Sequence, residues 1–152
     1  ENVFLSEWYD LPEAESATNM DAAYWAAIAQ VKDAVNKVIE STRNDGLISK
    51  SLTASVTLYC NGELFEQLSR LQDELRFVLI TSSAVVSDAA IPDSADATDV
   101  AGLSVFVEAN ADEKCVRCWH QRPDVGQHTQ HPELCGRCVD NIDGEGEVRH
   151  FA

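Results

Sequence analysis

Hydrophobic side chains recur at helical spacing between residues 18 and 46. The apolar positions are Trp25, Ile28, Val31, Val35, Val38 and Ile39. This period predicts an amphipathic helix with one apolar face. We expect Thr18 to cap its start, with the charge of Asp21 favouring the first turn. We expect the helix to end at 44–46, where Gly46 can adopt a left-handed conformation.

The pattern changes after residue 50 to a mixture of strands and one helix. Strict alternation of apolar and polar residues predicts a half-buried strand over 51–60 and another over 102–109. A shorter strand is expected over 82–87, and a loop over 91–98. Between the strands over 51–60 and 82–87, a second amphipathic helix is predicted that runs to about Leu79. Its apolar positions are Leu64, Leu68, Leu71, Leu75 and Val78. The first twenty residues include five large apolar side chains, Phe4, Leu5, Trp8, Tyr9 and Leu11, without helical order. They predict either an extended strap or a frayed terminus.

Charge is unevenly distributed over the 152 residues, whose formal net charge is −15. Residues 1–111 hold 18 acidic and 6 basic side chains, whereas residues 112–152 hold 8 acidic and 5 basic ones and all four histidines. Binding to phosphate backbones depends on Lys and Arg. An anionic partner is therefore expected to meet the protein at residues 112–152. The chain does not begin with Met and has no apolar leader, and we expect it to be part of a longer, non-secreted polypeptide.

Two Cys-x-x-Cys pairs lie in this less acidic part of the chain, in "KCVRCWH" and "PELCGRCV". Cys115, Cys118, Cys135 and Cys138 have the spacing C-x2-C-x16-C-x2-C. Each pair can turn both sulfur atoms toward one point, and four thiolates suit tetrahedral zinc. The motif therefore predicts one structural zinc per chain, with no open coordination position and no chemistry at the metal.

Other interpretations of these cysteines remain open. Two disulfides would require an oxidising compartment, a redox pair would require a thioredoxin-like context, and an iron centre could replace zinc. His120, His128 or His131 could replace one cysteine as a ligand. The fifth cysteine, Cys60, ends a predicted strand on its apolar side and is expected to be a buried hydrophobic residue.

The cysteine segment has too few large apolar residues to fold without help. Zinc binding supplies about 10–16 kcal/mol to such small sites, so metal binding and folding of this part are expected to be one event. The predicted fold class is α+β: a long helix, a small strand–helix–strand–strand unit, and a four-cysteine lobe similar to a zinc ribbon. The predicted divisions are residues 1–50, 51–111 and 112–152, and the last is called the zinc lobe below.

Several motifs together resemble the C-terminal region of bacterial isoleucyl-tRNA synthetases. They are the run "KCVRCWH", the run "LCGRCV", the stretch "GEGE" and the final "FA", together with "SVTLY" and "LRFVLITS" upstream. Thr53 departs from the family pattern, where an acidic residue is expected. The resemblance implies that residues 1–50 include the last helix of the anticodon-binding helical domain and that 51–111 join it to the zinc lobe.

The resemblance also implies an activity for the parent protein, a class I ligase that attaches isoleucine to its tRNA with ATP and magnesium. It implies no catalytic residue in this chain. The stretch "ISKS" at 48–51 follows a helix end without a nucleotide-binding unit before it, so we interpret it as a chance match. The expected partners are isoleucine tRNA and the remainder of the synthetase, with no DNA and no membrane, and the expected protein is a cytoplasmic monomer.

A role in RNA binding is expected for the residues around the cysteines. Trp119 follows a thiolate directly, so it either stacks on an anticodon-loop base or packs as a core residue of the lobe. The expected RNA contacts are Trp119, His120, Arg117, Arg122 and Arg137. The alternatives are a structural or protein-docking zinc ribbon without RNA contact, and a zinc finger of the type found in formamidopyrimidine-DNA glycosylases.

Overall fold

A computed structural model describes residue 4 and residues 20–151 of the chain. The predicted strap over the first twenty residues and the predicted capping role of Thr18 therefore fall almost entirely outside the described residues. Within them, helices and strands are mixed around one small sheet and are followed by a cluster of four cysteines. The predicted α+β fold class is confirmed.

The first long helix, α1 (Ala22–Asn44), begins later than predicted. Asp21 is the N-cap, and its Oδ1 accepts a hydrogen bond of 2.9 Å from the backbone N–H of Tyr24. A short acidic side chain satisfies an unpaired amide at this position and adds a favourable charge–dipole interaction. The prediction that placed Trp25 on the buried face is wrong, because Tyr24 is 5% exposed whereas Trp25 is 36% exposed.

The C-terminal end of α1 agrees with the sequence. Gly46 has φ of +76°, which is the left-handed conformation that glycine adopts at low cost. The backbone N–H groups of Gly46 and Leu47 donate to Arg43 O and Thr42 O, at 3.0 and 3.1 Å. These bonds satisfy carbonyls that the last helical turn leaves unpaired.

The sheet has four strands in the order β2-β1-β4-β3. Their bounds are β1 (Ala54–Tyr59), β2 (Ser83–Ser87), β3 (Asp96–Ala97) and β4 (Ser104–Ala109). The central strand β1 pairs parallel with β2 and antiparallel with β4. Residues of β1 alternate between buried and half-buried, as the sequence predicts, but residues 51–53 of the predicted strand form a 3₁₀ turn instead. The short strand β3 pairs with β4 inside the stretch predicted to be a loop.

The second predicted helix is interrupted. It consists of α2 (Gly62–Ser69), the 3₁₀ turn η3 (Gln72–Glu74) and α3 (Leu75–Leu79), and Gln72 has φ of +49° at the break. The apolar side chains Leu68, Leu71, Leu75 and Leu79 are nevertheless all buried. The apolar period thus reports which side chains face the core, although the helical hydrogen bonding is discontinuous.

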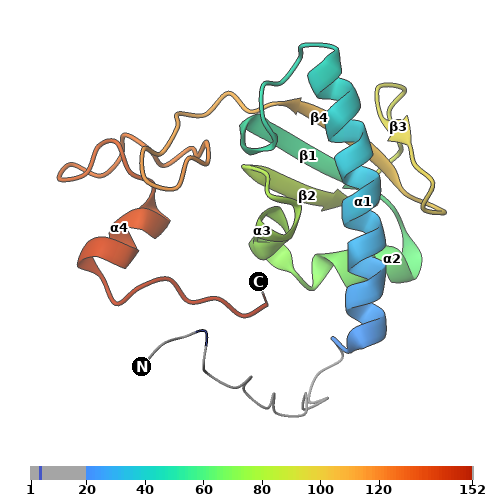
Figure 1. Ribbon diagram of the computed structural model, residues 1–152, viewed down its shortest axis with the longest axis horizontal. Helices are drawn as coiled ribbons and strands as arrows, with labels where there is room; N and C mark the ends of the chain where they lie inside the picture. Colours follow the sequence, from blue (N-terminus) through green and yellow to red (C-terminus); the bar gives the residue numbers. More distant parts are fainter. Residues whose placement is uncertain (1–3, 5–19, 152) are drawn as a thin grey trace.

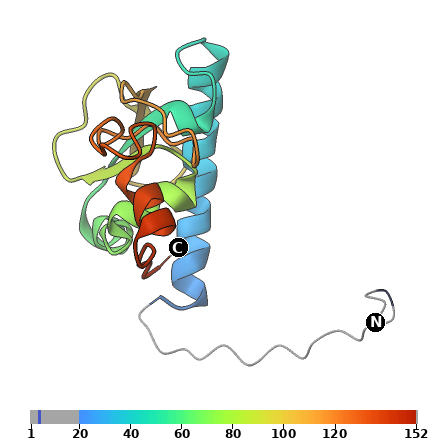
Figure 2. The same ribbon diagram turned by 90° about the vertical axis from the view of Figure 1, so that its left-hand side faces the viewer.

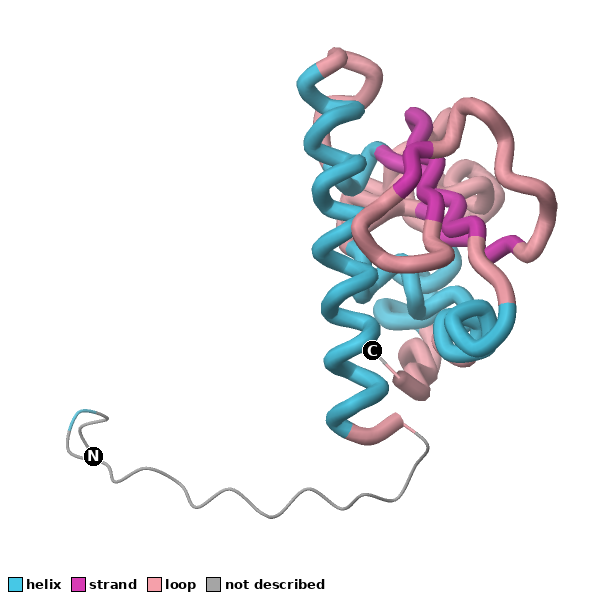
Figure 3. Tube along the Cα trace, turned by 90° about the vertical axis from the view of Figure 1, so that its right-hand side faces the viewer, coloured by secondary structure: helices cyan, strands magenta, loops and turns pink. Residues whose placement is uncertain are grey.

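The main core lies between the helices and the sheet (Figures 1 and 3). Figure 3 shows α1 running along one face of the sheet, and α2 and α3 contact β2 at its edge. The Tyr24 hydroxyl donates to Gln67 O at 3.0 Å and so connects α1 to α2. Residues on α1, β1, β4 and the α2–α3 segment contribute to one continuous cluster.

The zinc lobe lies to one side of this α/β part, beyond the end of the sheet (Figure 1). It has its own small cluster, centred on Leu134 and the cysteines. Its helix α4 (Gly136–Asp143) is followed by a segment that returns toward α1 and α3 (Figures 1 and 2). Phe151, near the end of that segment, packs against the main core.

Candidate metal centre

The first cysteine pair lies on a tight turn. An antiparallel bridge joins Lys114 to Gln121 at its base. Inside the turn, Cys115 N donates to His120 O and Trp119 N donates to Cys115 O, both at 2.9 Å. The sequence Lys-Cys-x-x-Cys-Trp-His therefore folds back on itself, so that both sulfur atoms can face one point.

The second cysteine pair lies at the beginning of α4. Cys135 is the N-cap of this helix, and Cys138 lies in its first turn, where its N–H donates to Cys135 O at 2.9 Å. Val116 N donates to Glu133 O at 3.1 Å, which connects the first turn to the segment before α4. The two pairs are thereby brought face to face.

The four sulfur atoms form one compact group. The Sγ atoms of Cys115, Cys118, Cys135 and Cys138 all lie within 4.8 Å of one another, and Cys118 and Cys135 are 3.7 Å apart. Tetrahedral zinc with Zn–S distances of about 2.3 Å requires sulfur atoms about 3.8 Å apart. All four cysteines are free, so the arrangement excludes disulfides between them and fits one tetrahedral ion.

The surroundings of the sulfur atoms influence the ionisation of the thiols. Burial raises the pKa of the Cys118 thiol, but the neighbouring His120 and Arg137 side chains and the His120 amide lower it more, to about 5. Burial also raises the pKa of Cys135, and the nearby Cys118 raises it further. Four thiolates in so small a space repel each other, and a bound cation removes that repulsion. The cluster is therefore suited to a divalent metal.

Two of the alternative histidine ligands, His128 and His131, make contacts away from the sulfur atoms. His131 Nε2 is 2.6 Å from Asp143 Oδ2, and His128 Nε2 is 4.0 Å from Asp124 Oδ2. Among the described residues, the group that could hold a metal consists of the four cysteines alone. Cys60 is 5% exposed and belongs to the main core, where burial raises the pKa of its thiol.

Trp119 is the most exposed aromatic residue of the zinc lobe. Its side chain is 60% exposed, so the interpretation of Trp119 as a core residue is wrong. Its φ is +68°, in the left-handed region that favours Gly or Asn over a bulky residue. Neither burial nor backbone preference accounts for Trp at this position. The Lys114 ammonium lies 5.5 Å from the centre of its ring.

The remaining residues predicted to bind RNA differ in accessibility. Arg117 is exposed, and its Nη1 donates to Cys138 Sγ at 3.6 Å. Arg122 and Arg137 are 26% and 19% exposed in their side chains and form ion pairs with Asp73 and Glu147. His120 is 8% exposed and its ring packs edge-on against Phe77. A direct RNA contact by His120 is incompatible with this burial.

Two surface residues beside Trp119 were not predicted. Lys114 is exposed, and Val116 is 53% exposed on the same turn. The sequence indicates their exposure only through their positions next to Cys115. When a cysteine in a short turn points toward a metal site, its neighbours in the sequence point outward.

Known proteins are similar both to the cysteine segment and to the whole chain. A family model described as "Zinc finger found in FPG and IleRS" matches residues 112–141. Isoleucine–tRNA ligase of Saccharophagus degradans is 55% identical over 150 residues, which is 99% of this chain. The predicted resemblance to the isoleucine–tRNA ligases is confirmed. The isoleucine–tRNA ligases of Teredinibacter turnerae and Alcanivorax borkumensis are 53% and 51% identical, over 99% and 100% of the chain.

The chain spans about 16% of the length of the isoleucine–tRNA ligases that it matches. Those relatives are enzymes, and the similarity identifies this chain as a counterpart of one part of them. In the part of the chain that the structure describes, no helix is both long enough and apolar enough to traverse a bilayer.

Proposed function

We propose that this chain is the non-catalytic, anticodon-side tRNA-binding region of an isoleucine–tRNA ligase. The similarity to proteins named isoleucine–tRNA ligase over 99% of the chain supports this proposal. In the parent protein, other domains would bind ATP and magnesium and attach isoleucine to the tRNA. The parent protein would be a cytoplasmic monomer.

One zinc ion, held by Cys115, Cys118, Cys135 and Cys138, would have a structural role. Four thiolates occupy all positions of a tetrahedral ion, so no position remains for water or substrate. The ion would hold the turn 114–121 against the start of α4. The apolar cluster of the lobe is too small to stabilise its fold, so the metal would supply most of the folding free energy of the lobe.

The exposed face of Trp119 is the observation that supports RNA contact most directly. The backbone of Trp119 is left-handed and lies on a turn that the metal would support. A large aromatic ring presented in this way is suited to stack on an unpaired base. Lys114 and Arg117, both exposed on the same turn, could contact the adjacent phosphates. We propose Lys114 for this role in place of Arg122, Arg137 and His120. The two arginines form ion pairs within the protein, and the His120 ring packs against Phe77.

The acidity of the chain limits the affinity of this region alone. With a formal charge of −15, it repels a phosphate backbone at long range. Most of the affinity for tRNA would then come from the rest of the ligase, and this region would contribute the anticodon-side contact.

The decisive experiment replaces Trp119 by Ala in the full-length parent protein. Loss of one stacking interaction, worth about 1–3 kcal/mol, is expected to reduce tRNA charging about 5- to 150-fold. Isoleucine activation without tRNA should be unchanged. Trp119→Phe, which keeps an aromatic face, should recover part of the loss.

Trp25→Ala is the matched control, because Trp25 is also partly exposed but lies on α1. It should leave charging unchanged. Metal content must stay at about one zinc per chain in every variant. Normal charging by a zinc-containing Trp119→Ala protein would favour a structural or protein-docking zinc ribbon, and tighter binding to duplex DNA than to tRNA would favour a DNA-binding module.

A further inference from the structure

Glu74 is a buried carboxylate at the break between α2 and α3. It ends the turn η3 (Gln72–Glu74) and is 9% exposed. Its Oε1 accepts a hydrogen bond from the N–H of His150, and its Oε2 accepts one from the N–H of Phe151, both at 2.7 Å. A single carboxylate thus binds two successive amides that lie 76 and 77 residues later in the chain.

Through these two hydrogen bonds, the C-terminal segment, residues 147–151, is bound to the α/β part of the same chain. A buried carboxylate is costly unless charge-assisted hydrogen bonds compensate for its lost hydration. Because both oxygens bind backbone amides, recognition depends on the path of the chain rather than on the side chains at 150 and 151. Phe151 adds an apolar contact with the main core.

Phe77, one turn after Glu74, is the meeting point of three segments. The guanidinium groups of Arg76, Arg149 and Arg137 lie 4.0, 4.0 and 5.1 Å from the centre of its ring. They come from α3, from the C-terminal segment and from α4 respectively. Cation–π contacts of this kind are strongest where water is excluded.

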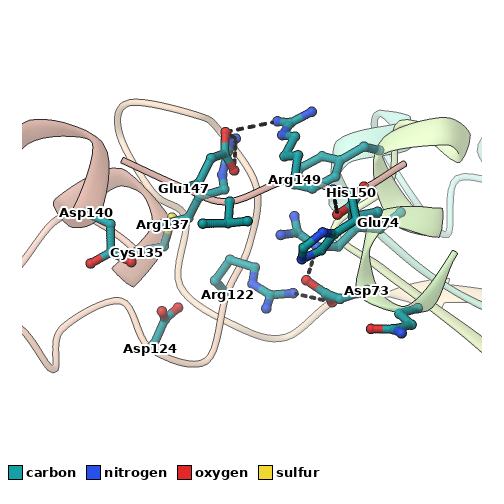
Figure 4. Close-up of a pocket in the computed structure, with 14 residues that line it drawn as sticks. Asp73, Glu74, Arg122, Asp124, Cys135, Arg137, Asp140, Glu147, Arg149 and His150 are labelled. Carbon is teal, nitrogen blue, oxygen red and sulfur yellow. Dashed lines mark hydrogen bonds and ion pairs between the residues drawn. The ribbon is translucent and has the colours of Figure 1, made fainter. Parts of the chain in front are cut away.

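Glu147 connects two of these arginines. Its Oε1 is 3.1 Å from Arg137 Nη1 and 3.2 Å from Arg149 Nη2. Figure 4 shows Arg137 and Cys135 approaching from the α4 side, with Glu74 and Asp73 on the opposite side of a cavity of about 400 Å³. Since Arg137 lies between Cys135 and Cys138, the metal cluster and the C-terminal segment share one network.

A second contact holds the other side of the zinc lobe. Ser82 Oγ accepts a hydrogen bond of 2.7 Å from Gln121 N, and Ser82 O accepts one of 3.3 Å from Arg122 Nη1. Gln121 follows Trp119 by two residues. The lobe is therefore attached to the α3–β2 corner on the Trp119 side and to Glu74 through the C-terminal segment.

We propose that Glu74 is a positioning residue: it binds the C-terminal segment and thereby fixes the orientation of the zinc lobe and the Trp119 face. The role of Glu74 in orienting Trp119 rests on the proposed function, whereas the binding of the C-terminal segment by Glu74 does not. Arg122 and Arg137, which the sequence presents as RNA contacts, stabilise this joint instead.

Amide hydrogen exchange measured by NMR on the zinc-bound chain tests the first part. Glu74→Gln removes the charge and places an NH₂ group against one of the two amide donors. Exchange at His150 and Phe151 is expected to accelerate at least about tenfold, because hydrogen bonds to charged groups contribute strongly. Protection in α1 and the zinc content should remain unchanged.

Glu66→Gln is the matched control, since Glu66 is exposed on α2 and the substitution removes the same charge. It should leave the exchange at residues 150 and 151 unaltered. Equal exchange in the two variants would overturn the proposal.

His150→Pro removes one donor from the other side of the interaction and leaves Glu74 intact. It should accelerate exchange at Phe151, and adding Glu74→Gln to it should have less effect than Glu74→Gln alone. Additive effects would contradict a direct contact. If Glu74→Gln unfolds the whole chain, unchanged Phe151 exchange in His150→Pro would still refute the proposal.

Binding of a labelled isoleucine tRNA transcript to the full-length protein tests the second part. Glu74→Gln should weaken binding several-fold relative to Glu66→Gln. Faster exchange with unaltered tRNA binding would overturn the positioning role while the contact stands. The proposed function itself fails separately, if Trp119→Ala has no effect on charging.

Discussion

At the scale of single residues, neighbours in the sequence have opposite environments. Cys118 belongs to the sulfur cluster, Trp119 is 60% exposed and His120 is 8% exposed. Trp119 has a left-handed backbone conformation within the turn that reverses the chain between Lys114 and Gln121. Three consecutive residues can thus serve the metal, the surface and the joint.

A prediction at this scale concerns the metal ligands. Cys138→Ser should reduce the zinc content from about one per chain to near zero, because a neutral hydroxyl is a poor substitute for a thiolate. Elemental analysis of reduced, chelator-free protein measures it. Cys60→Ser is the control and should retain the metal, since Cys60 lies in the main core. Full zinc occupancy in Cys138→Ser would exclude a four-cysteine site.

At the scale of secondary-structure elements, the residue at which a helix begins depends on which capping side chain reaches a free backbone amide. Thr18 and Asp21 are both suitable capping residues, but α1 begins after Asp21, whose side chain reaches the amide three residues on. The break between α2 and α3 leaves the apolar period intact and places Glu74 where the C-terminal segment passes.

The helix cap leads to a prediction about stability. Asp21→Ala should lower the free energy of unfolding by about 1 kcal/mol, because the Tyr24 amide loses its partner and the helix start loses a negative charge. Urea unfolding followed by circular dichroism measures the change. Asp33→Ala, at an exposed position inside the same helix, removes the same charge and should not destabilise the protein. Equal losses in both variants would rule out a capping effect.

At the scale of the whole molecule, two cores of unequal size are joined by polar contacts and by the packing of Phe151. The main core has many large apolar residues, whereas the lobe cluster consists of the cysteines and a few aliphatic side chains. Hydrogen bonds and guanidinium contacts connect them at Glu74, Phe77 and Ser82. The predicted division at residues 51–111 and 112–152 stays a prediction.

Metal removal tests this division. A strong chelator should abolish amide protection in the zinc lobe while α1 and β1 retain theirs, because only the lobe depends on the metal for its folding. The amides of His150 and Phe151 should lose protection together with the lobe, since their segment follows α4. Simultaneous loss of protection throughout the chain would mean a single cooperative core.

The sequence by itself determined most of the buried positions of the long helix, of β1 and of β4, and it determined the four-cysteine motif. These features have short periods or short spacings, so they are visible without knowing the fold. Only the tertiary structure decided that Trp119 is exposed, that Arg122 and Arg137 are engaged in the joint, and that Glu74 binds the end of the chain. The reason is physical: the availability of a charged side chain depends on partners that lie 10 to 77 residues away, and no local pattern records them.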